Sequence, residues 1–299
     1  MSETKPASPR RRIRPCIIGR DGAGKSWLAA TFPKKMLVCL FDAPDKAGEY
    51  LKRGVPGDIE QAQHCYFQNV FSASDPERLI IRVEYWGEAN PSSPTSYGRF
   101  VQRSSTIEAE IVSESYQTVV LDSVTAFELA ARFYSEYRAN ATNADNRAHY
   151  NFSMHACEQF VMTRWPNLVF ANAIVIAHYD EQKDETDSGL AVSRKMIAVP
   201  GKLPNRIGTQ FSEMWRVYQD DAGGRHVQTQ PRPSPNNFAC KTAIGFEDGV
   251  YPHYEALWKS VKQNDKPLLA AQNTPTEKPS MEGGSNGDVE LQPTAAAAV

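Results

Sequence analysis

The sequence lacks any apolar run that approaches the roughly 20 residues needed for a helix to cross a bilayer. The N-terminal residues also lack the apolar core of a secretory signal peptide. We therefore expect no membrane-spanning segment, and we expect a cytoplasmic protein.

Cysteine is scarce and unpaired in sequence. The five cysteines are odd in number and form no CxxC pair. This pattern favours reduced thiols over a disulfide framework. The pairs His64-Cys65 and His155/Cys157 lack the ligand spacing of a structural zinc site, so we expect no zinc there. The cysteines are Cys16, Cys39, Cys65, Cys157 and Cys240.

Excess charge of either sign is also absent, since the formal net charge is −2. Any nucleic-acid site must therefore be a local patch.

Residues 1–13 carry several basic side chains and are expected to form a disordered arm, or to contact a phosphate backbone. Residues 263–299 are rich in Pro, Thr, Gly, Asn and Ser and are expected to be a disordered tail. The expected folded domain covers 14–262.

The sequence does contain a complete GxxxxGK[ST] phosphate-binding loop at residues 19–26. Its glycines allow backbone N–H groups to point at phosphate oxygens, its lysine reaches the β- and γ-phosphates, and its serine hydroxyl can ligate Mg²⁺. An apolar stretch precedes the loop and a helical one follows it. The pattern predicts ATP and Mg²⁺ as ligands. The residues expected to contact the nucleotide are Gly19, Asp21, Gly22, Ala23, Gly24, Lys25, Ser26 and Trp27.

Continuous apolar strands alternate with helical patterns, which is typical of an α/β fold with a mostly parallel sheet covered by helices on both faces. Strands are expected at 36–41, 118–121 and 173–177, with a weaker candidate at 66–70. Helical patterns cover 125–138 and 148–165. The segment 87–106 is rich in Pro, Ser and Gly and is expected to be an inserted loop.

Two of these strands end in polar residues. Asp122 ends one strand and is expected to hold Mg²⁺ together with Ser26; the alternative is a plain helix N-cap. His178 follows another and is expected to contact the γ-phosphate or its attacking water; the alternative is a strand-end cap.

The order of these motifs resembles the RecA-like P-loop ATPase core, and more narrowly phage-encoded RecA-like proteins that include single-strand annealing recombinases. The stretches that carry the resemblance are 19–26, Leu-Phe-Asp-Ala at 40–43, Val-Val-Leu-Asp-Ser-Val at 119–124 and Ile-Ala-His at 176–178. The resemblance implies an ATPase that acts in DNA recombination or annealing, with single-stranded DNA as a partner. It also implies a homo-oligomer with nucleotide near the subunit interface, and a location in the host cytoplasm if the protein is phage-encoded.

The chain departs from this family at one catalytic position. RecA-type enzymes carry a glutamate just after the second strand, and Pro44 stands there in this sequence, between Asp42 and Asp45. Either aspartate can reach a water as the base, or both are solvated loop residues. We therefore expect nucleotide binding more firmly than turnover.

The residues that the RecA-like resemblance implies near DNA carry charges of both signs. Residues 180–187, expected to form a loop, carry five acids and one lysine, which would repel a phosphate backbone. Basic residues further along could bind DNA, reach a neighbouring subunit's phosphates or be ordinary surface, while Arg216 is expected to be structural or at an interface. These basic residues are Arg194, Lys195, Lys202 and Arg206.

Two alternative functions are also compatible with the phosphate-binding loop at residues 19–26. A small-molecule kinase would need a lid with arginines, for which 87–106 with Arg99 and Arg103 is the candidate. A non-hydrolysing nucleotide-dependent assembly protein is favoured by the missing glutamate.

Overall fold

The computed structural model describes residues 11–54, 81–88, 90–139, 146–185, 191–232, 238 and 240–261. The strand expected at 66–70, the arm through residue 10 and the C-terminal tail lie outside these ranges. Ile13, which we assigned to the arm, is buried, and its backbone N–H donates to the side-chain oxygen of Asn172 at 2.9 Å. The packed domain therefore begins before residue 14.

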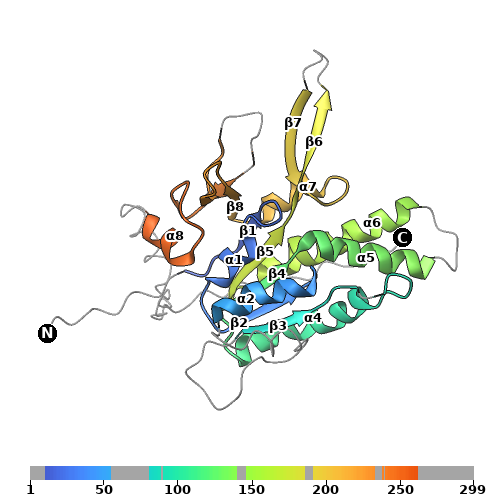
Figure 1. The fold of residues 1–299 in the computed structure, drawn as a ribbon. Coiled ribbons are helices and arrows are strands. Elements are labelled where there is room, and N and C mark those ends of the chain that lie inside the picture. Colours follow the sequence, from blue (N-terminus) through green and yellow to red (C-terminus); the bar gives the residue numbers. More distant parts are fainter. Residues whose placement is uncertain are drawn as a thin grey trace, which may run out of the picture.

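The chain alternates strands and helices (Figure 1). The strands are β1 (Pro15–Ile18), β2 (Met36–Leu40), β3 (Ile81–Tyr85), β4 (Thr118–Asp122), β5 (Asn172–Ala177), β6 (Tyr179–Glu185), β7 (Ala191–Ile197), β8 (Glu213–Gln219), β9 (Arg225–Gln228) and β10 (Lys241–Thr242). The α-helices are α1 (Lys25–Ala30), α2 (Ala47–Gly54), α4 (Ser96–Ser113), α5 (Val124–Ala139), α6 (Asn146–Cys157), α7 (Leu203–Ile207) and α8 (Tyr254–Ser260). The shorter turns are η1 (Pro44–Lys46), η2 (Glu158–Arg164), which continues α6 as a π-helix, η3 (Trp165–Asn167) and η4 (Gly208–Gln210).

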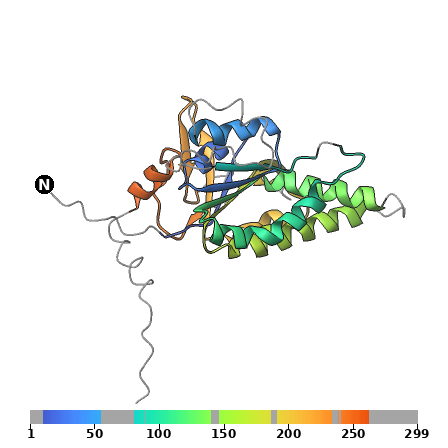
Figure 2. The same cartoon turned by 90° about the horizontal axis from the view of Figure 1, so that it is seen from below.

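The main sheet has the strand order β10-β8-β1-β5-β4-β2-β3, and β9 also pairs with β8. Every neighbouring pair from β8 to β3 is parallel, whereas β9 and β10 run antiparallel to β8. Figure 2 shows α2 over one face of the sheet and α4, α5 and α6 under the other. The expected fold, a mostly parallel sheet with helices on both faces, is confirmed.

Each central strand supplies side chains to two hydrophobic cores, because successive residues point to opposite faces. In β5, Ala173, Val175 and Ala177 pack into the core beneath α4, α5 and α6. Ile174 and Ile176 pack into the opposite core with α1 and α2. Since both faces are covered, the strands are apolar throughout, which is why the sequence predicted them as continuous runs. Within the described ranges, no helix combines the length and apolarity that a bilayer span requires.

The segment 87–106 is not one inserted loop, because α4 begins at Ser96. The helix buries Tyr97, Phe100, Ser104, Ile107 and Ile111 at helical spacing. Its serines and glycine concealed this period in the sequence, and packing against the sheet outweighs their weak helix propensity.

Arg103 of α4 holds a buried carboxylate. Its Nη2 lies 2.8 Å from Glu84 Oε1, and its Nη1 lies 2.5 Å from Glu110 Oε1. Glu84 is only 1% exposed, and Arg82 Nε also lies 3.1 Å from it. The guanidinium is therefore engaged within the fold, which counts against a role in a kinase lid.

We expect Arg103→Met to lower the free energy of unfolding by about 3 kcal/mol, because it leaves a buried carboxylate with one cation in place of two. Denaturant unfolding measures this loss. Arg99→Met is the matched control on the same helix, where the side chain is exposed, and we expect a loss within about 0.5 kcal/mol. A similar loss for both variants would contradict the role given to Arg103.

Residues 180–187 were expected to form a loop, but 180–185 belong to β6, which pairs with β7 as an antiparallel hairpin with Tyr179 opposite Ile197. Residues 186 and 187 lie outside the described ranges. Figure 1 shows this hairpin extending from the end of β5 away from the main sheet. The sequence of β6 is almost entirely polar and has no alternating apolar pattern, so periodicity gave no strand signal there.

Candidate nucleotide site

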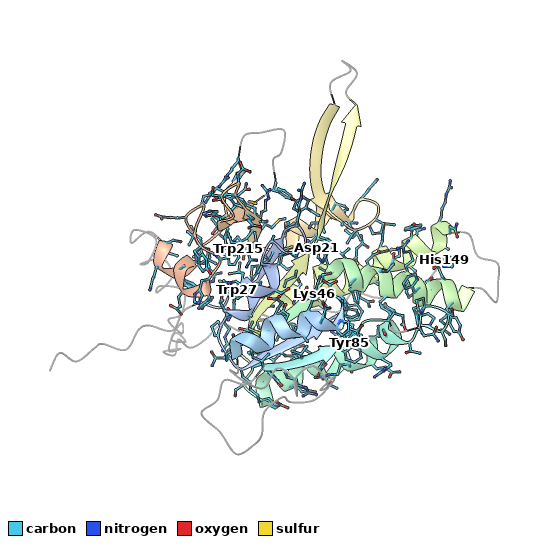
Figure 3. The ribbon with its side chains drawn as sticks, viewed as in Figure 1. Asp21, Trp27, Lys46, Tyr85, His149 and Trp215 are labelled. Atoms are coloured by element: carbon cyan, nitrogen blue, oxygen red, sulfur yellow. The ribbon has the colours of Figure 1, made fainter. Side chains whose placement is uncertain are left out.

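Four sequence motifs meet at the carboxyl edge of the parallel sheet. The phosphate loop follows β1, Asp42 follows β2, Asp122 ends β4 and His178 follows β5. The strand register brings them level, since Ile18 pairs with Ala177 and Leu40 pairs with Asp122. In Figure 3 the labelled Asp21, Trp27 and Lys46 gather at this edge, while His149 lies far along the α5–α6 pair.

The phosphate loop has the strand before it and the helix after it that its sequence requires. Gly22 and Gly24 adopt φ of 72° and 102°, a left-handed conformation that other residues rarely take. Gly19 has no room for a side chain, because an added Cβ would lie 2.6 Å from the Val217 carbonyl oxygen. Gly19 therefore packs directly against the backbone of β8.

Lys25 folds back over this loop. Its Nζ donates to the carbonyl oxygens of Gly19 and Arg20, at 2.9 Å each. The residue is 6% exposed, and burial lowers the pKa of Lys25 to about 8 although nearby carboxylates oppose this shift. A buried ammonium beside backbone amides is a strong attractor for a polyphosphate.

Ser26 and Asp122 lie together, as the sequence predicts for a magnesium pair. Ser26 Oγ donates to Asp122 Oδ2 at 2.7 Å, and the Tyr50 hydroxyl donates to the same oxygen at 2.6 Å. Burial and the nearby charge of Asp42 raise the pKa of Asp122, which is 1% exposed. A divalent cation would offset both effects.

The donor set at this position fits Mg²⁺ in part. Mg²⁺ prefers six oxygen ligands and usually takes several from water and phosphate. Ser26 Oγ and Asp122 supply two oxygens beside the loop that would hold the phosphates. Within the described ranges, no cluster of three or more His, Cys, Asp and Glu side chains could hold a metal alone. The residues therefore suit a nucleotide-bound Mg²⁺ and not a protein-only cage.

Asp42 is held by three side chains. Its Oδ2 accepts from Lys46 Nζ at 2.6 Å and lies 3.1 Å from His178 Nε2, and its Oδ1 accepts from Ser123 Oγ at 2.9 Å. Burial raises the pKa of Asp42, but the hydrogen bonds from His178 and Lys46 outweigh burial and hold it well below its ordinary value. Asp42 is therefore an ionised acceptor and a weak proton base.

His178 links Asp42 to the lysine of the loop. Its Nδ1 lies 3.3 Å from Lys25 Nζ and 3.0 Å from Asp21 Oδ1. A tautomer that accepts from Lys25 at Nδ1 and donates to Asp42 from Nε2 satisfies both of those contacts. The histidine therefore lies between the lysine of the loop and the carboxylate that follows β2.

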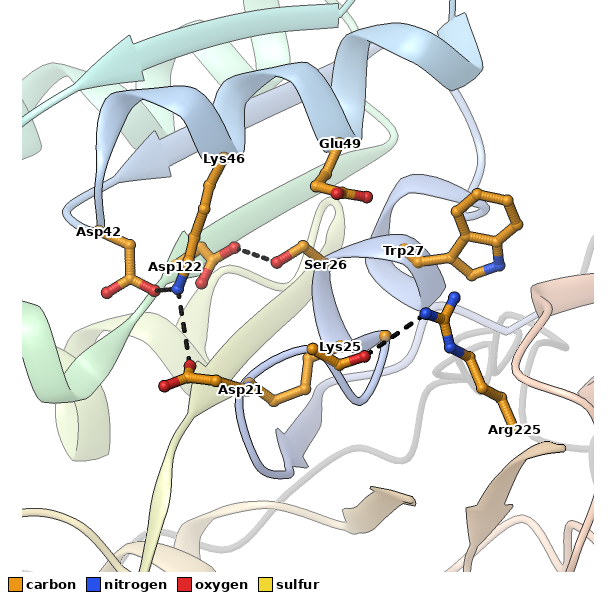
Figure 4. Close-up of a pocket in the computed structure, with 11 residues that line it drawn as sticks. Asp21, Lys25, Ser26, Trp27, Asp42, Lys46, Glu49, Asp122 and Arg225 are labelled. Carbon is orange, nitrogen blue, oxygen red and sulfur yellow. Dashed lines mark hydrogen bonds and ion pairs between the residues drawn. The ribbon is translucent and has the colours of Figure 1, made fainter. Parts of the chain in front are cut away.

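The other predicted residues fall at or near the cavity. Asp21, Gly22, Gly24, Lys25, Ser26 and Trp27 line it, together with Asp42 and Asp122 (Figure 4). Asp45 is exposed on the η1 turn. A hollow on the His178 side shares Asp21, Asp42 and Lys46 with this cavity and is also lined by Arg20, Thr125, His178 and Tyr179.

Several residues at this cavity were not selected from the sequence. Lys46 lines it from the end of η1, Glu49 from the first turn of α2 and Arg225 from β9. Tyr50, also on α2, reaches Asp122. A helix starting shortly after Asp42 could have pointed to the α2 residues. No local pattern marks Arg225, which is about 200 residues from the loop in sequence.

A second hollow adjoins the loop on the β8 side. It is lined by Arg20, Tyr179, Arg216 and Tyr218, among others. The guanidinium carbon of Arg216 lies 5.1 Å from the centre of the Tyr218 ring and 5.9 Å from that of Tyr179. Arg216 was expected to be structural or at an interface, and it stands half-buried in this hollow.

Comparison with known proteins places the domain in a family. Residues 11–239 match a family described as an AAA domain. No curated protein matches the chain. A solved structure titled as a prototypical ATPase from the type III secretion system of pathogenic bacteria is similar over 70% of this chain, with 12% identity and a TM-score of 0.38. The chain spans about half of that protein, 52% of its length. With three quarters of its length matched and its phosphate loop at the carboxyl edge of a parallel sheet, the chain belongs to the AAA domain family and is an AAA-type P-loop ATPase domain.

Proposed function

We propose that the chain binds ATP with Mg²⁺ and hydrolyses it slowly, and that it acts in DNA recombination or single-strand annealing. The observation that carries the nucleotide part is the meeting of Lys25, the Ser26–Asp122 pair and His178 around one loop. The loop amides and Lys25 would hold the phosphates, and Ser26 with Asp122 would hold Mg²⁺. When bound, Mg²⁺ neutralises developing charge on the phosphates.

Hydrolysis needs a group that orients the attacking water. Asp42 is ionised and bonded to Lys46, Ser123 and His178, so it can accept a hydrogen bond from water but is poorly suited to take its proton. His178, at the same carboxylate, would sense the γ-phosphate. This arrangement supports slow turnover. It also leaves open the second candidate, a nucleotide-dependent assembly protein that does not hydrolyse ATP.

Support for a nucleic-acid partner comes from the hollow between the loop and β8. Its lining combines tyrosines with arginines, the side-chain types that stack on bases and bind phosphates in nucleic-acid sites. Arg20 and Tyr179 line both this hollow and the one that contains His178. A DNA strand bound in this hollow would contact the residues next to the expected γ-phosphate position. We also expect self-association, with nucleotide near the subunit interface.

Phosphate release by the full chain, measured with and without single-stranded DNA, tests this proposal. We expect slow basal release that DNA stimulates, and stimulation that weakens as salt rises. Tyr218→Ala should reduce the stimulation and leave basal release unchanged. Tight ATP binding with no release in either condition would favour the assembly protein. Transfer of phosphate to a metabolite would support the kinase. The ion pairs of Arg103 within the fold already count against that alternative.

A further inference from the structure

Arg225 contacts the phosphate loop although the two are far apart in sequence. It is the first residue of β9, opposite Gln219 of β8, just after a turn in which Gly223 adopts φ of 86°. This tight β8–β9 connection returns the chain beside the loop. Arg225 Nη2 lies 3.5 Å from the Gly22 carbonyl oxygen, and its Cδ lies 3.3 Å from the position of a Cβ added to Gly24.

The guanidinium is exposed and weakly engaged. Its one hydrogen bond to the part of the chain that the structure describes is this long contact to Gly22. Glu49 lines the same cavity, but no ion pair joins it to Arg225 among the described residues. An arginine fork with most of its donors available can bind phosphate oxygens in pairs.

The position of Arg225 identifies which phosphate it would meet. Lys25, Ser26 and Asp122 mark the side of the β- and γ-phosphates and Mg²⁺, and the loop amides cradle the α- and β-phosphates. Figure 4 shows Arg225 beside Trp27, on the opposite side of the loop from Asp42. The α-phosphate and the sugar of a bound nucleotide would lie on that side.

The charges around the cavity indicate why a bound polyphosphate would need Arg225 in addition to Lys25. Its lining carries three cationic side chains, Lys25, Lys46 and Arg225. The same lining carries four acids, Asp21, Asp42, Glu49 and Asp122. Lys46 is already bonded to Asp42. A polyphosphate therefore depends on Lys25, Mg²⁺ and Arg225 for its counter-charge.

We propose that Arg225 binds the α-phosphate of a nucleoside di- or triphosphate held on the loop of the same chain. This assignment rests on the proposed nucleotide binding and adds a specific ligand group to it. Since ADP and ATP share the α-phosphate, Arg225 contributes equally to the affinity for both, unlike a residue that contacts only the γ-phosphate.

Equilibrium titration of the full chain with fluorescent ADP and ATP analogues in Mg²⁺ tests the assignment. Arg225→Ala should weaken both ligands by a similar factor of about 10- to 30-fold, as expected for a hydrogen bond to a charged group. Arg225→Lys keeps a point charge and should recover part of that loss. Arg232→Ala is the control: Arg232 is an exposed arginine nearby in sequence that binds Asp248, and its loss should change affinity less than twofold.

Each outcome decides a different claim. Unchanged affinity in Arg225→Ala, beside a wild-type chain that binds, would overturn the assignment and leave the proposed function standing. Loss of ATP binding alone would place Arg225 at the γ-phosphate and would also overturn it. A wild-type chain that binds neither nucleotide would overturn the proposed function and this assignment with it. Thermal melts of the apo variants check that their fold is intact.

Discussion

Replacing Lys25 by alanine is expected to weaken ATP binding by about 100-fold. The lysine is the buried cation of the loop, and its Nζ lies within hydrogen-bond reach of both the loop carbonyls and His178. Hydrogen bonds to charged groups contribute about 1.5–3 kcal/mol each, so losing one strong contact or two weaker ones gives a change of this size. Titration with a fluorescent ATP analogue measures it.

Lys25→Met is the companion variant, because it keeps most of the side-chain volume and removes only the charge. Both variants should lose affinity to a similar degree. Since burial disfavours the charged form of Lys25, the apo Met variant should melt no lower than the wild-type protein. Wild-type ATP affinity in either folded variant would contradict the role of the loop.

Replacing Asp122 by asparagine is expected to abolish the effect of Mg²⁺ on ATP binding and to lower phosphate release by about 100-fold. Asparagine retains an oxygen that can accept from Ser26 and Tyr50, but it lacks the negative charge that a metal requires. Metal-ion catalysis contributes several kcal/mol, which corresponds to a rate factor of this order. Titrations with Mg²⁺ and with EDTA measure the binding part.

The stability of the same variant separates a metal role from a structural one. In the apo protein the charged form of Asp122 is disfavoured by burial and by Asp42, which is why its pKa is raised. An acid with a raised pKa costs stability at neutral pH, so the neutral asparagine should leave the apo melting temperature unchanged or higher. A lower melting temperature with an unchanged Mg²⁺ response would show that Asp122 is structural.

The parts of the site that could be predicted from sequence lie where local rules determine position. A buried parallel strand needs apolar residues on both faces, so β2, β4 and β5 were visible as continuous runs. The first polar residue after such a strand lies at the carboxyl edge of the sheet, which is why Asp122 and His178 could be expected beside the loop. Their placement together follows from the strand order β1-β5-β4, which brings the ends of these three strands side by side.

The parts that could not be predicted depend on contacts distant in sequence. Arg225 meets the loop only because β9 pairs with β8 and β8 pairs with β1. Helix α4 was missed because its packing outweighs its serines, and the β6–β7 hairpin was missed because β6 is almost entirely polar. Asp42 was one of two candidate bases, together with Asp45, and only the structure shows the bonds from Lys46 and His178 that lower its pKa.

Isothermal titration of the full chain with ATP in the presence of Mg²⁺ measures whether the phosphate loop binds the nucleotide. We expect saturable binding of one ATP per chain, competition by ADP, and weaker binding when EDTA removes the metal. Absence of saturable binding at ATP concentrations of about 1 mM, where even a contact worth about 4 kcal/mol would register, would contradict this expectation.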